Sequence, residues 1–87
     1  MLPSFQMTGM KRAHFRFYAE LNDFLPPERR FADIEQSYID AAPVKDMIES
    51  LGVPHTEIDL ILANGQSVNF SYVVQDGDRI RDRKSVV

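Results

Sequence analysis

The chain has no cysteine, and this absence excludes several kinds of site. None of its 87 residues can form a disulfide, bind zinc as a thiolate or act as a cysteine nucleophile. It also has no run near the roughly 20 apolar residues of a membrane span. The opening residues lack the basic and continuous apolar regions of a signal peptide. We therefore expect a cytoplasmic protein, stabilised by packing alone.

Glycine and histidine are scarce as well, which removes further classes of function. The four glycines form no cluster that opens a helix, so the sequence has no loop suited to cradling a phosphate. The two histidines, His14 and His55, are far apart and have no obvious partner for metal binding or acid–base chemistry. No serine lies in a nucleophile motif. We expect no catalytic, cofactor or metal site, and no enzyme activity.

The composition is typical of a small folded domain with an acidic balance. Hydrophobic residues make up 44% of the chain, and its length is that of one domain. A net charge of −3 argues against a general nucleic-acid surface, which would normally be basic. We expect nucleic acid to be an unlikely partner for the chain by itself.

Two segments in the first half have the alternating pattern of strands. Apolar Ala13, Phe15 and Phe17 fall on one face of the first, while His14, Arg16 and Tyr18 fall on the other. The pair Pro26-Pro27 breaks the pattern, since proline lacks the backbone donor that a central strand needs. A weaker alternation over residues 31–39 predicts a second strand.

One amphipathic helix follows. Its apolar residues recur at i, i+3, i+4 and i+7 and so share one stripe, which consists of Val44, Met47, Ile48 and Leu51. Pro43 suits the first helical position, and Gly52 suits the left-handed position after the helix end. A helix of about two turns is unstable alone in water, so its stripe must pack on the apolar face of the sheet.

The second half predicts further strands joined by tight turns. Residues 58–63 are apolar on both sides apart from Asp59, as in a strand buried within a sheet. Asn64-Gly65 predicts a type I′ hairpin turn, and Val68, Phe70 and Tyr72 alternate beyond it. Asp76-Gly77 predicts another turn, into residues 79–81.

This order of elements predicts an α+β fold of the β-grasp, ubiquitin-like type, with a mixed sheet of four to five strands packed on one helix. We expect the domain to occupy residues 13–81. Residues 1–12 are predicted to form a flexible tail and residues 82–87 a polar C-terminal tail.

Two groups of residues are candidates for contact with a partner. His14, Arg16 and Tyr18 lie on the sheet side that one helix leaves uncovered, and Tyr and Arg are enriched at binding hot spots. The alternative is an ordinary polar sheet face. Arg79 and Arg81, followed by Arg83 and Lys84, form the densest basic stretch, which suits an acidic partner or a phosphate backbone. The alternative there is an edge strand protected by charge.

Three stretches of the sequence resemble a known family. They are residues 14–30, residues 44–57, and Asp59-Leu60-Ile61-Leu62 with Asn64-Gly65. Together they resemble a bacterial ubiquitin-like domain that is commonly fused ahead of a Mut-seven-C RNase domain, a PIN-like nuclease. The resemblance covers the chain from about Ala13 to Ile80. It implies a β-grasp fold related to the sulfur carriers ThiS and MoaD, in a protein-binding or regulatory role beside an RNA-processing nuclease.

The resemblance and the residues leave three functions open. The first is a non-catalytic interaction module whose protein partner is a Mut-seven-C, PIN-like RNase. The second is a ThiS/MoaD-like sulfur carrier, which we disfavour because such carriers activate a C-terminal glycine, whereas this sequence reads Arg83-Lys84-Ser85-Val86-Val87. The third is weak RNA binding through Arg79, Arg81, Arg83 and Lys84, which predicts affinity that falls strongly with salt.

Overall fold

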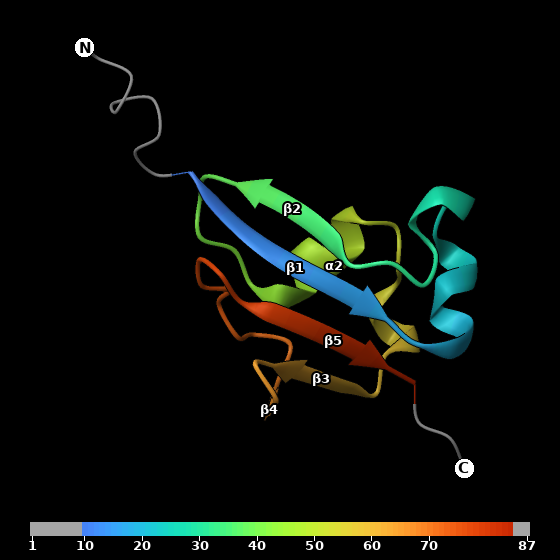
Figure 1. Cartoon of the computed structure of the whole chain (residues 1–87). Helices are drawn as coiled ribbons and strands as arrows, with labels where there is room; N and C mark the ends of the chain where they lie inside the picture. Colours follow the sequence, from blue (N-terminus) through green and yellow to red (C-terminus); the bar gives the residue numbers. More distant parts are fainter. Residues whose placement is uncertain (1–9, 85–87) are drawn as a thin grey trace.

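The computed structural model describes residues 10–84, which form a five-stranded sheet with one α-helix against one of its sides (Figure 1). The strands are β1 (Lys11–Phe17), β2 (Ile34–Tyr38), β3 (Leu60–Ala63), β4 (Gln66–Val68) and β5 (Arg79–Arg83). The α-helix is α2 (Val44–Ser50), and the short 3-10 helices are η1 (Ala19–Phe24), η2 (Pro27–Arg29) and η3 (His55–Glu57).

The strand order is β2-β1-β5-β3-β4. β1 and β5 run parallel, whereas the other neighbouring pairs are antiparallel. The predicted mixed sheet of an α+β domain is therefore confirmed. The alternative that Arg79 and Arg81 protect an edge strand by their charge is wrong, because β5 pairs with β1 on one side and with β3 on the other (Figure 1).

The core lies between α2 and the sheet side that faces it, which we call the covered face. All four residues of the predicted helical stripe are buried, and Phe15 and Phe17 of β1 are buried with them. Burial of this apolar surface is what stabilises a helix only seven residues long. The remaining core residues come from the strands, from η1 and from the loops: Ala13, Leu21, Leu25, Ile34, Val53, Ile58, Ile61, Ala63, Val74 and Ile80.

Both ends of the folded region extend beyond the predicted boundaries. β1 begins at Lys11, which pairs with Tyr38 of β2. β5 continues to Arg83, which pairs with Leu60 of β3, so Asp82 and Arg83 belong to a strand and not to the predicted tail. In each case the neighbouring strand is long enough to continue the pairing. The rest of the two predicted tails, residues 1–9 and 85–87, lies outside the described residues.

The turn predictions hold where glycine or asparagine requires a left-handed backbone. Asn64 and Gly65 have φ of 53° and 87°, as a type I′ turn demands, and Gly52 has φ of 104° just after the helix. Pro43 precedes the helix as its N-cap, one position before the predicted one.

The alternation beyond Asn64-Gly65 does not produce a long strand. β4 ends at Val68, because the Asn69 side chain accepts a hydrogen bond from the Ser71 backbone N–H and turns the chain. Phe70 and Tyr72 pack against the core from the loop that follows.

Candidate functional site: the open face of the sheet

The sheet side opposite α2 carries most of the residues predicted as contacts. We call this side the open face and define it by alternate residues of the strands and their continuations. In the pairing register, His14 of β1 lies beside Arg79 of β5, and Arg16 lies beside Arg81. The open face consists of Arg12, His14, Arg16, Tyr18, Asp33, Glu35, Ser37, Leu60, Leu62, Ser67, Arg79, Arg81 and Arg83.

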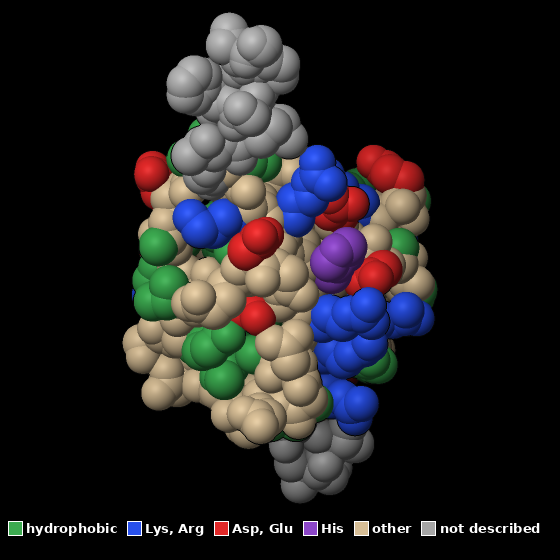
Figure 2. All heavy atoms as spheres, turned by 60° about the vertical axis from the view of Figure 1, so that its left-hand side comes forward, with side chains coloured by type: hydrophobic (Ala, Val, Ile, Leu, Met, Phe, Trp, Pro, Cys, Tyr) green, Lys and Arg blue, Asp and Glu red, His purple; other side chains and the backbone are tan. Residues whose placement is uncertain are grey.

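The two groups of contact residues predicted separately are thus one surface. They belong to strands at opposite ends of the sequence, and the parallel pairing of β1 with β5 joins them. Figure 2 shows Lys and Arg side chains gathered beside a histidine on one side of the molecule. The surface carries Arg12, Arg16, Arg79, Arg81 and Arg83, which are five of the ten Lys and Arg residues of a chain whose net charge is −3.

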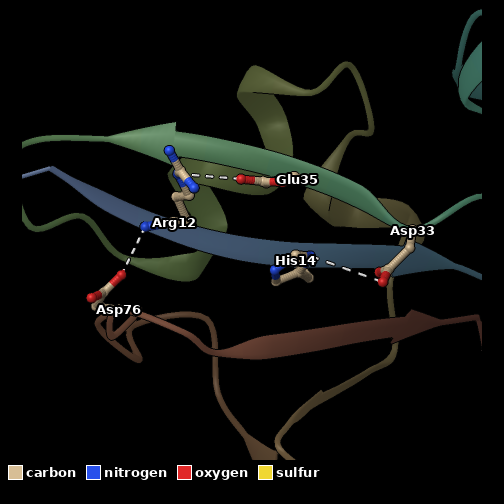
Figure 3. A network of polar contacts seen from close by, with 5 residues as sticks. All are labelled: Arg12, His14, Asp33, Glu35 and Asp76. Atoms are coloured by element: carbon tan, nitrogen blue, oxygen red, sulfur yellow. Dashed lines mark hydrogen bonds and ion pairs between the residues drawn. The ribbon is translucent and has the colours of Figure 1, made fainter.

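The basic side chains of this face have carboxylate neighbours toward β2, whereas those toward β5 have none within ion-pair distance among residues 10–84. Arg12 Nε lies 3.3 Å from Glu35 Oε2, and His14 Nδ1 lies 3.9 Å from Asp33 Oδ2 (Figure 3). The Arg12 backbone N–H also donates to Asp76 Oδ1 at 2.9 Å. By contrast, within residues 10–84 no carboxylate lies within ion-pair distance of Arg16, Arg79, Arg81 or Arg83. A band of unpaired positive charge therefore follows β5.

Tyr18 is held in place by two of these arginines. Arg81 donates a hydrogen bond of 2.9 Å from its guanidinium to the Tyr18 hydroxyl. The guanidinium carbon of Arg83 lies 4.6 Å from the centre of the Tyr18 ring, within cation–π distance. The hydrogen bond from Arg81 is the main cause that lowers the Tyr18 pKa, with the charges of Arg81, Arg16 and Arg83 adding to it and burial opposing it. The Arg–Tyr cluster is thus ordered before any partner binds.

Leu60 and Leu62 add an apolar part that the sequence did not predict. The apolar pattern of residues 58–63 predicts burial on both sides, but Leu60 is 38% exposed and Leu62 is half-buried. Leu60 pairs with Arg83 and Leu62 with Arg81. Both leucines therefore share the open face with the arginines. The prediction failed because nothing covers β3 on this side among the described residues.

Lys84, the last member of the predicted basic stretch, does not contribute to the unpaired charge. Its ammonium group lies 3.0 Å from Glu57 Oε1, and this contact raises the Lys84 pKa. Residues 85–87, on which the sulfur-carrier alternative depends, lie outside the described residues.

Comparison with known proteins identifies the family. The model of the family described as Mut7-C ubiquitin matches residues 10–85. The chain belongs to the Mut7-C ubiquitin family. No curated protein sequence is significantly similar to it. Among solved structures, the solution structure of the Haloferax volcanii HVO 2177 protein is similar, with a TM-score of 0.68, 22% identity, and coverage of 91% of this chain and 87% of that one.

These matches confirm the ubiquitin-like β-grasp fold that the sequence resemblance implied. The resemblance pointed to a bacterial family, whereas the similar solved structure comes from an archaeon. At this level of identity the structural likeness establishes the fold and says nothing about a shared partner.

This Mut7-C ubiquitin domain has two further ionisable clusters, around Glu49 and around Asp78. Glu49 hydrogen-bonds the ring and the backbone N–H of His55, whose ring meets Phe70 edge-on. This contact lowers the Glu49 pKa and ties α2 to η3. Asp78 accepts hydrogen bonds from Asn64, from the Tyr72 hydroxyl and from the Gln75 backbone. Both clusters join loops to neighbouring elements.

Within residues 10–84, no group of three or more His, Cys, Asp or Glu side chains is arranged to hold a metal ion. No helix in the same region is long and apolar enough to cross a membrane.

Asp82 is a carboxylic acid among the apolar side chains of the covered face. It lies on β5 between Phe17 of β1 and Ile61 of β3, is fully buried, and neither carboxyl oxygen has a hydrogen-bond partner among the described residues. Burial raises the pKa of Asp82 to about 8. Burial therefore favours the neutral form of the side chain, because an unpaired carboxylate in the core would be strongly unfavourable.

Proposed function

We propose that this Mut7-C ubiquitin domain is a non-catalytic, cytoplasmic protein-interaction module that binds its partner through the open face. One observation carries the proposal: Arg16, Arg79 and Arg83 lie on one face of the sheet without carboxylate partners among residues 10–84, and Arg83 lies over the ring of Tyr18 on the same face. Gathering like charges on one surface is unfavourable for the isolated domain. A partner that supplies negative charge would relieve this repulsion.

The composition of the surface supports a protein as the partner. Arg and Tyr are the residue types that most often dominate binding energy, and here Leu60 and Leu62 lie beside them. Because Tyr18 is already fixed by Arg81 and Arg83, less side-chain entropy is lost on binding.

We propose further that the partner is a Mut-seven-C, PIN-like RNase to which the domain is accessory. The family name, Mut7-C ubiquitin, and the sequence resemblance to domains found beside such nucleases support this choice. The proposal also makes a demand on the nuclease: because the domain binds through arginines, the nuclease must carry an acidic surface.

A charge-reversal experiment tests the surface. The full chain, Arg16→Glu/Arg79→Glu and the matched control Arg29→Glu/Lys45→Glu would each be used to capture partners from the native host, with identification by mass spectrometry. Neither Arg16 nor Arg79 makes a side-chain hydrogen bond or ion pair within residues 10–84, so both double variants should fold. Folding would be checked by amide NMR spectra.

We expect the same protein to be recovered with the wild type and the control, and to be reduced at least about tenfold with the open-face variant. An RNase of the expected class among the proteins lost would support the named partner. Equal recovery with all three proteins would refute binding through the open face.

A further inference from the structure

The open face is divided into stripes that follow the strands. Acidic Asp33 and Glu35 lie toward β2, where Glu35 forms an ion pair with Arg12 and Asp33 lies near His14 of β1. The unpaired arginines follow β5 together with Arg16. Leu60 and Leu62 lie next to them on β3. A partner that covers β5 and β3 therefore meets a positive stripe and an apolar stripe side by side.

The spacing within the positive stripe is set by the strand itself. Arg79, Arg81 and Arg83 occupy alternate positions of β5, so their Cα atoms repeat at about 6.6 Å, twice the rise per residue of a strand. The apolar stripe on β3 has the same repeat, because Leu60 and Leu62 are also two residues apart. Neighbouring strands lie about 4.8 Å apart, which separates the two stripes.

An extended chain lying along the boundary of the two stripes has the same period. Its successive side chains point to opposite sides, so every second residue would face the arginines and the others would face the leucines. Acidic residues at one set of alternate positions and aliphatic residues at the other would match both stripes.

A second copy of this chain does not fit the open face. A two-fold symmetric contact places the same patch of both copies together. β5 is the central strand of the sheet, so a face-to-face pair would bring arginines against arginines.

Single-stranded RNA fits less well than a protein segment. Phosphates would match the arginines, but Arg83 already covers one face of the Tyr18 ring that a base would stack on. Leu60 and Leu62 offer nothing to a phosphate backbone, and the chain is acidic overall.

We infer that the open face binds an extended protein segment in which acidic and aliphatic residues alternate, with the acidic side chains on Arg79, Arg81 and Arg83 and the aliphatic ones on Leu60 and Leu62. This inference rests on the proposed function and specifies the chemistry of the partner.

Synthetic peptides of equal composition test the alternation. The first probe is a short capped peptide in which Glu and Val alternate. The second contains the same residues as a block of Glu followed by a block of Val, and in the third Gln replaces every Glu. Each would be titrated into the full chain and followed by amide NMR, with a uridine oligonucleotide of similar length as a fourth probe.

We expect the alternating peptide to shift amides of β5 and β3 and to bind at least about tenfold more tightly than the block peptide, while the Gln peptide shows no saturable binding. Arg16→Glu/Arg79→Glu should abolish this binding and Leu60→Ser should weaken it. The control Arg29→Glu/Lys45→Glu should bind as the wild type does.

Equal affinity for the alternating and block peptides would overturn the inference, since charge alone would then suffice. Absence of binding by any peptide, or saturable binding of the oligonucleotide to the open face, would also overturn it. The proposed function is tested by a different result from the one that tests this inference. If capture of the native partner depends on Arg16 and Arg79 while the peptides do not bind, the open face remains the binding surface and only the extended acidic–aliphatic segment is wrong.

Discussion

Ionisable side chains are solvent-accessible on one face of this sheet and buried on the other, and β5 contributes side chains to both faces. On its open side Arg79, Arg81 and Arg83 keep contact with water or with Tyr18. On its covered side Ile80 is buried, and Asp82 is buried without a partner within residues 10–84. A charge on the open face costs little folding free energy and is available for recognition. A carboxyl on the covered face lowers stability as soon as it ionises.

The largest effect should come from removing the ionisable group on the covered face. In the unfolded chain Asp82 ionises near the ordinary pKa of 3.8, whereas burial raises its native pKa to about 8. Asp82 therefore loses its proton at lower pH in the unfolded state than in the folded state. As a result, the free energy of unfolding falls as the pH rises from about 4 to about 8. Asp82→Asn should be more stable than the wild type by on the order of 5 kcal/mol at pH 9, since each unit of pKa is about 1.4 kcal/mol.

Urea unfolding measured across this pH range would test the effect. The two proteins should differ little at pH values below about 4, where Asp82 is protonated in both states. Asp23→Asn, at an exposed position in η1, is the control and should follow the wild type throughout. A wild-type stability that is flat between pH 4 and 8 would show that Asp82 has a partner or reaches water.

The next largest effect should come from the helical stripe on the covered face. Ile48 is fully buried, so Ile48→Ala should lower the free energy of unfolding by about 3 kcal/mol. Asp46→Ala, on the exposed side of α2, should change it by less than about 0.5 kcal/mol. Chemical denaturation measures both. Similar losses for the two variants would mean that α2 does not pack on the sheet as described.

A smaller loss should follow from removing the buried Asn22 in η1. Its side-chain amide donates to the carbonyls of Phe17 and Ala19, and its oxygen accepts from the Phe31 N–H at 2.7 Å. Phe31 has φ of 55°, an unusual conformation for a bulky residue, and the bond from Asn22 helps to hold it there.

Asn22→Ala should destabilise the domain by about 2 kcal/mol, because buried backbone groups lose their partners. Asp23→Ala is the neighbouring control and should have little effect. Denaturation of both variants would measure the difference. An unchanged stability for Asn22→Ala would mean that water reaches these backbone groups.

The covered face could be predicted from the sequence because its pattern is local. The spacing of Val44, Met47, Ile48 and Leu51, and the alternation around Phe15 and Phe17, depend only on the period of one element. Pairing between strands depends on the whole chain. The central position of β5, and hence the pairing of Arg79 with His14 and of Arg81 with Arg16, follows from tertiary pairing that no local period encodes.

Two other residues could not be placed from the sequence for the same reason. The charged neighbours of Asp82 in sequence predict a polar tail, yet β1 and β3 flank Asp82 and bury it. The several hydrogen bonds of Asn22 could not be predicted from the sequence, since its partners include Phe31, nine residues away across a loop. The order of the predicted elements indicates a β-grasp fold, and the resemblance to Mut-seven-C-associated domains implies the same fold.

The smallest predicted effect is a shift in the pKa of Tyr18 on the open face, and it can be measured without a partner. The chain has three tyrosines. The pKa of Tyr72 is raised to about 12, chiefly by its hydrogen bond to Asp78, and burial raises that of Tyr38. The pKa of Tyr18 is lowered instead, chiefly by the hydrogen bond from Arg81. Tyr18 should therefore ionise first in an alkaline titration followed by absorbance or NMR.

Arg81→Met should raise the Tyr18 pKa and leave that of Tyr72 unchanged, while the control Arg29→Met should alter neither. A Tyr18 pKa that does not respond to Arg81→Met would show that the Arg–Tyr contact is not formed in solution. The same titration reports on recognition: an acidic segment bound to Arg81 and Arg83 would neutralise the charges that favour the phenolate, so the Tyr18 pKa should rise when the alternating peptide binds.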